Sequence, residues 1–74
     1  MHREIELRYE NEYRNTELRE LINTFIELNH QYRIAIVAFL LHPNPPNRDS
    51  DLRYLAFIKR KVEIINEIIK EKQR

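Results

Sequence analysis

The chain has 74 residues, and we expect residues 1–74 to form a single small domain. It contains no cysteine, which excludes disulfides, thiolate metal sites and cysteine nucleophiles. The formal net charge is only +1, which excludes a strong overall field for nucleic acid or anionic lipid. No apolar run is long enough to span a membrane, so we expect a soluble protein, cytoplasmic if it is natural.

Glycine is absent from the sequence, although average usage would place about five glycines in a chain of this length. Natural domains use glycine where a turn or a helix end needs a positive φ angle. The one obvious loop of this chain is instead rich in Pro and Asn. This composition indicates a de novo designed protein, although the few alanines and the many asparagines are unusual for a design.

Residues 1–15 alternate between charged and largely apolar positions. Every even position from 4 to 14 carries a charge, which is a period of two and predicts a β-strand. A short helix is the alternative, and it would align Ile5, Tyr9 and Tyr13 while leaving Leu7 on the opposite side.

Residues 16–41 are predicted to form a long helix, with Asn15 or Thr16 as its N-cap. Its apolar positions follow one another at steps of three and four, which is typical of a coiled-coil seam. The members of this seam are Leu18, Leu21, Phe25, Leu28, Tyr32, Ala35 and Phe39.

All three prolines fall within residues 42–50, so this segment is predicted to be a loop. Residues 51–72 are predicted to form a second helix, capped by Asp49, Ser50 or Asp51. Its seam consists of Leu55, Ile58, Val62, Ile65 and Ile69, and a parallel row of Tyr54, Phe57, Ile64 and Ile68 widens the apolar face.

The expected fold class is therefore mainly α: an N-terminal β-strand or short helix, followed by a long antiparallel helical hairpin. Two features predict that this β-α-α unit assembles as a helical-bundle homodimer or higher homo-oligomer. A single strand needs a partner, and the back of the first helix becomes apolar at Ile34, Val37 and Leu41. The predicted oligomer or partner interface comprises Ile5, Leu7, Tyr9, Leu18, Leu21, Phe25, Leu28, Tyr32, Ile34, Val37, Leu41, Leu55, Ile58, Val62, Ile65 and Ile69.

The residues that could act as metal ligands or catalytic groups are better explained by structural roles. Glu27 and His30 have the Glu-x-x-His spacing of di-metal bundles, but the helical period places both on the solvent side. His42 is expected to complement the C-terminal end of the first helix. Lys61 falls inside the apolar sector of the second helix, where its stem can pack while its charge reaches water. We predict no enzyme activity, no cofactor and no metal site.

A strand-helix-helix order in a dimer resembles the ribbon-helix-helix repressors, which implies a two-stranded ribbon in the major groove of DNA. The outward row of that ribbon would contain four Glu and two Arg, a net charge of −2, which phosphates would repel. We therefore predict a self-assembling structural scaffold. The alternatives are a module that binds a protein through the apolar face or the N-terminal strand, and a dimeric nucleic-acid-binding protein.

Overall fold

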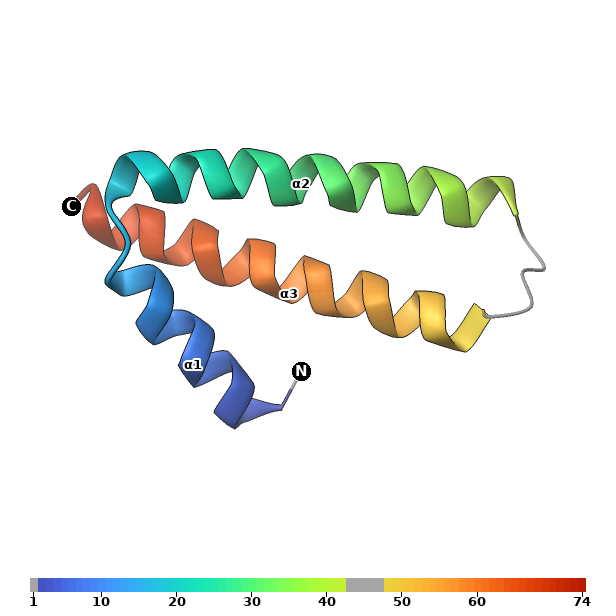
Figure 1. Cartoon of the computed structure of the whole chain (residues 1–74), viewed down its shortest axis with the longest axis horizontal. Helices are drawn as coiled ribbons and strands as arrows, with labels where there is room; N and C mark the ends of the chain where they lie inside the picture. The colour runs from blue at the N-terminus through green and yellow to red at the C-terminus, as the bar shows by residue number, and fades with distance from the viewer. Residues whose placement is uncertain (1, 43–47) are drawn as a thin grey trace.

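The computed structural model describes residues 2–42 and 48–74, and within them it has three helices and no strand. The helices are α1 (Arg3–Arg14), α2 (Leu18–Leu41) and α3 (Arg48–Lys72). Figure 1 shows α2 and α3 antiparallel, with α1 on the other side of α3. α3 is the central helix, because it packs against both of the others while α1 and α2 contact each other little. The mainly helical class and the antiparallel hairpin are confirmed.

The predicted N-terminal strand is wrong, and the short-helix alternative describes α1. The alternating charges form ion pairs along the helix: Arg3 lies 3.3 Å from Glu6, and Arg14 lies 3.8 Å from Glu10. The Glu4 amide donates to the Nδ1 atom of His2 at 3.4 Å, which caps the first turn. The resemblance to the ribbon-helix-helix repressors depended on a strand here, and it is not supported.

The turn between α1 and α2 uses its polar residues differently from the prediction. Asn15 ends α1 in the right-handed helical region, and the Thr16 hydroxyl donates to the Glu12 carbonyl at 2.8 Å. Neither residue therefore caps α2, which begins at Leu18 after Glu17, whose side chain makes no capping bond. Asn15 and Thr16 both belong to the C-terminal end of α1.

α3 begins at Arg48 and not at residue 51, so none of the expected caps Asp49, Ser50 and Asp51 precedes the helix, and Asp49 and Asp51 lie inside its first turn. There their carboxylates still favour the positive end of the helix dipole. The remaining loop residues, 43–47, which include all three prolines, lie outside the described residues.

The main core lies at the end of the molecule where the α1–α2 turn meets the last turns of α3 (Figure 1). Tyr13 from α1 and Leu21 from α2 pack there against the isoleucines of α3, and Leu21 and Ile65 are 0 % exposed. The parallel apolar row of α3 had suggested a second partner for this helix. Ile64 and Ile68 of that row are buried in the same cluster as Tyr13 of α1, so the chain itself provides this second partner.

α1 runs in the same general direction as α3 but at an angle to it (Figure 1), and polar contacts join the two helices. Arg60 of α3 donates to Glu6 near the start of α1 at 2.6 Å. At the other end, the Lys72 ammonium donates to the Arg14 carbonyl at 2.8 Å. Between them the Lys61 ammonium lies 4.6 Å from the centre of the Tyr9 ring, a cation–π contact. Lys61 therefore helps to attach α1 to α3.

Candidate interaction surface

α1 covers only part of the α2–α3 hairpin. Glu6 and Tyr9 in the middle of α1 reach Arg60 and Phe57 of α3, and the Tyr9 and Phe57 rings meet edge to face with centroids 6.0 Å apart. Beyond these residues the described structure contains two helices only, as Figure 1 shows at the end of the hairpin away from the chain termini. We call this the distal end, and it comprises residues 34–42 of α2 and its cap and 48–55 of α3.

At the distal end, α2 is apolar on all sides. Residues 34–41 form an unbroken apolar run, and successive residues turn by about 100° around a helix. α3 covers only the side that carries Phe39, which is half-buried. The centre of the Phe39 ring lies 5.6 Å from the Cζ atom of Arg48. The outer sides remain in water: Ile34, Val37, Leu40 and Leu41 are 56, 54, 69 and 72 % exposed.

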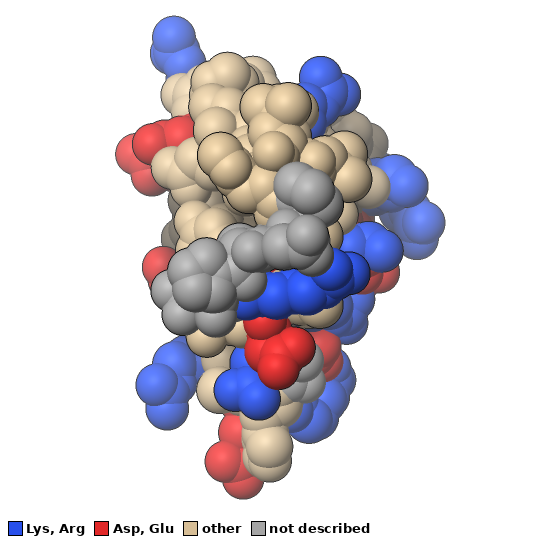
Figure 2. Space-filling view, turned by 90° about the vertical axis from the view of Figure 1, so that its right-hand side faces the viewer, with Lys and Arg blue, Asp and Glu red and all other residues tan. Residues whose placement is uncertain are grey.

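These four residues form what we call the distal apolar surface. Figure 2 views the molecule from this end, where uncharged residues cover the upper part over α2 while Lys, Arg, Asp and Glu lie to the sides and below. Leu52 and Tyr54 of α3 are also exposed at this end. Contiguous exposed apolar patches of this kind are typical of interaction sites.

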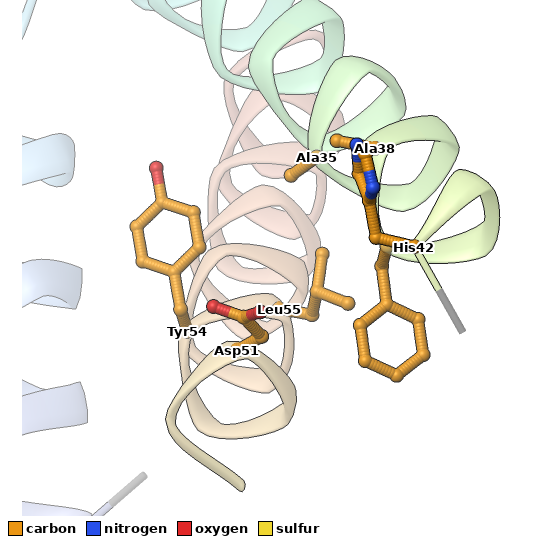
Figure 3. Close-up of a pocket in the computed structure, with 7 residues that line it drawn as sticks. Ala35, Ala38, His42, Asp51, Tyr54 and Leu55 are labelled. Atoms are coloured by element: carbon orange, nitrogen blue, oxygen red, sulfur yellow. The ribbon is translucent and has the colours of Figure 1, made fainter. Parts of the chain in front are cut away.

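A pocket of about 270 Å³ lies between α2 and α3 at the distal end. Figure 3 shows Asp51 and Tyr54 of α3 on one side of it and Ala35, Ala38 and His42 on the other. The two alanines leave this space because their side chains are too short to fill it. Among the described residues, no hydrogen bond is formed by the side chains of Asp51, Tyr54 or His42. The pocket is thus a continuation of the uncovered surface between the two helices.

A second depression, of about 360 Å³, lies on the outer side of α2. It is lined by His30, Arg33, Ile34 and Val37, four residues of the same helix at positions i, i+3, i+4 and i+7. This depression belongs to the distal apolar surface through its last two residues.

The predicted interface residues fall into three groups in the structure. Leu21, Ile58 and Ile65 are buried inside the chain, where they hold its helices together. Eight are half-buried along the helix contacts, namely Tyr9, Leu18, Phe25, Leu28, Tyr32, Leu55, Val62 and Ile69. Five are exposed, namely Ile5, Leu7, Ile34, Val37 and Leu41. Only the last three of these lie together at the distal end.

Leu40 and the core residue Tyr13 were not among the predicted interface residues. Leu40 lies beside the seam that faces α3, but it is 69 % exposed because no third helix reaches the distal end. The unbroken apolar run 34–41 contains the signal that could have identified it. Tyr13 was part of the α1 stripe that only the helical alternative predicts.

Groups with perturbed pKa values lie at the contact between α1 and α3. The hydrogen bond from Arg60 lowers the pKa of the Glu6 carboxyl, and the same bond raises the pKa of Arg60. Burial raises the pKa of Tyr13 to about 12. These shifts reflect the docking of α1.

Glu27 and His30 are both exposed on α2. Within residues 2–42 and 48–74, no three His, Asp or Glu side chains come together as a metal site would require. None of the described helices combines the length and the apolar character needed to cross a membrane. No protein-family model, curated protein or solved structure matches the chain.

Proposed function

We propose that this chain is a non-enzymatic structural protein whose function is to associate with further copies of itself through the distal apolar surface. One observation carries the proposal: α2 is apolar all round over its last two turns, while α3 covers only one side of it. A helix that is apolar on every side is normally buried on every side.

The free energy gained by burying the distal apolar surface supports self-association. Fully burying a Val, Leu or Ile side chain contributes roughly 2 kcal/mol. In a two-fold symmetric dimer each residue of the patch is used twice, because both copies present the same surface. The four exposed residues of the distal apolar surface can therefore offset much of the entropy lost on association.

A designed origin is part of this proposal. None of the described residues has a positive φ angle, so the described helix ends do not need glycine. This agrees with the absence of glycine from the whole sequence. Designed scaffolds built from regular helices likewise avoid positive φ angles.

The proposal is tested by the mass of the protein in solution, measured by light scattering on a sizing column over a concentration series. We expect a dimer or larger oligomer for the unaltered chain. The double variant Val37→Glu/Leu41→Glu should be a monomer with unchanged helical content by circular dichroism, because neither side chain is part of the core. Asn23→Glu, at an exposed position of the same helix, is the matched control and should keep the mass of the unaltered chain.

An unaltered chain that stays monomeric at every concentration would overturn the proposal. The distal apolar surface would then be the docking site of a different protein, which is the alternative function. A double variant that remains oligomeric would also overturn it, because the association would then use another surface.

A further inference from the structure

We infer that the second copy packs its α2 antiparallel against the outer side of this α2, with the two-fold axis at Val37. This arrangement deepens the proposed self-association and rests on it. It specifies which residues of the two copies meet.

The first support is the shape of the outer side of α2. The depression lined by His30, Arg33, Ile34 and Val37 has the i, i+3, i+4, i+7 pattern of a hole in knobs-into-holes packing. In such packing a single side chain of a facing helix fills the space between four residues. The hole here is on the outside of the hairpin, where a side chain of a second copy can fill it.

The second support is the position of the side chain that would fill the hole. If Val37 faces its own copy in an antiparallel pair, Arg33 faces the partner's Leu41 and Ile34 faces the partner's Leu40. Leu41 is 72 % exposed, the highest value among the exposed large apolar residues of the chain that the structure describes. Leu41 also lies on the same outer side of α2 as Ile34 and Val37, since the three residues are separated by steps of three and four. It is therefore the knob that this register places over the hole.

The third support is electrostatic. The last turn of α2 contains no Lys or Arg to complement the negative end of its helix dipole, and the side chain of His42 at the C-cap makes no hydrogen bond with the described residues. In the inferred pair Arg33 of each copy lies beside the last turn of the partner's α2 and supplies this positive charge. A parallel pair would instead bring the two Arg33 side chains together, and like charges at close range are unfavourable.

A register centred on Ile34 is less favourable than one centred on Val37. It would place Glu27 opposite the partner's Leu41, so that a carboxylate would meet the negative end of a helix. Centring on Val37 avoids this contact and keeps the charged residues before Arg33 outside the overlap. The charges of α2 thus favour this pair over a parallel one and over the register centred on Ile34.

Oxidative crosslinking tests this arrangement, because the unaltered chain contains no cysteine. Val37→Cys places a thiol of each copy next to the axis, and we expect most of the protein to become a disulfide-linked dimer on mild oxidation. Ile34→Cys is the matched control one turn away. Its two copies would be offset by about 9 Å along the helices, beyond the reach of a disulfide, and we expect at least tenfold slower crosslinking.

A second control, Leu52→Cys, places a thiol at an exposed apolar position of α3 that the inferred interface does not include. For all three variants the rate of crosslinking is measured, and the mass of each reduced protein is determined by light scattering. If the reduced proteins are dimers but Ile34→Cys or Leu52→Cys crosslinks as fast as Val37→Cys, the inferred pairing is wrong while the proposed self-association stands. If the unaltered chain and the reduced variants are all monomers, both are wrong.

Discussion

The Nε atom of Arg60 donates a hydrogen bond to the Oε1 atom of Glu6 at 2.6 Å, which joins the first turns of α1 to the middle of α3. The contact extends in both directions, since Arg60 also donates to Glu63 at 3.2 Å and Glu6 accepts from Arg3 at 3.3 Å. Together with the contact between the Tyr9 and Phe57 rings, this chain of four charged residues attaches α1 to the middle of α3 and not to the distal end.

Removing the charge of Glu6 should loosen α1. We expect Glu6→Gln to lower the free energy of unfolding, by the small amount that is typical of ion pairs in contact with solvent. Urea denaturation followed by circular dichroism measures the change. Glu4→Gln is the control, because Glu4 is exposed and its side chain forms no ion pair with the described residues. Equal losses in the two variants would contradict a specific role for the Glu6–Arg60 contact.

The same contact should depend on pH in a defined direction. The pKa of Glu6 is lowered in the folded chain from an ordinary value of 4.5, so folding favours its charged form. Its contribution to stability is fully present above 4.5 and is lost as the pH falls through the lower, folded-state pKa. The difference in unfolding free energy between the unaltered chain and Glu6→Gln should therefore be present at neutral pH and disappear in strong acid. A difference that is the same at both pH values would argue against it.

Tyr13 should make the fold sensitive to alkali. Burial raises its pKa from 10.0 to about 12, so the folded state favours the neutral phenol. This contribution is fully present below pH 10 and is lost as the pH rises towards 12. A tyrosinate absorbance titration should show a late-ionising group that is missing in Tyr13→Phe. The control Tyr54→Phe, which changes an exposed tyrosine, should retain this group. A late group that persists in Tyr13→Phe would contradict the assignment.

Substitutions of two leucines of α2 should affect different properties, one the stability of the fold and the other self-association. Leu21 is fully buried, and we expect Leu21→Ala to lower the free energy of unfolding by about 3 kcal/mol. Leu40→Ala should change the stability of the monomer by less than about 0.5 kcal/mol, since Leu40 is largely exposed. It should instead weaken self-association, which dilution followed by light scattering detects. The separation would fail if Leu40→Ala destabilised the monomer as much as Leu21→Ala does.

The two long helices could be predicted from sequence because their patterns have only one interpretation. Apolar residues at steps of three and four run from Leu18 to Phe39 and from Leu55 to Ile69, and prolines separate the two runs. α1 could not be predicted in the same way, because a charge at every even position fits a strand as well as a helix. Contacts that the sequence does not show decide between them: the Tyr9 and Tyr13 rings stack with centroids 6.0 Å apart, and Glu6 reaches Arg60.

The candidate surface was partly predictable for a related reason. Ile34, Val37 and Leu41 were identified because they are apolar on the polar side of a helix. Leu40 was not, because it follows the seam residue Phe39 and does not lie on the polar side of the helix. Its exposure depends on the position of α1, because Glu6 and Tyr9 of α1 contact Arg60 and Phe57 of α3, which lie outside the distal end. The position of one helix is a property of tertiary packing, and the pattern of another helix does not contain it.

The central place of α3 has a consequence for folding on the ribosome. Four of the six buried apolar residues among the described ones, Ile58, Ile64, Ile65 and Ile68, belong to α3, the last of the three helices to be synthesised. Until they emerge, α1 and α2 have little to pack against, because they contact each other only weakly. The nascent segments of α1 and α2 therefore have no core to pack against until these isoleucines have left the ribosome. A chain that stops before Ile58 would contain the unbroken apolar segment 34–41 but none of the four isoleucines that form most of the core.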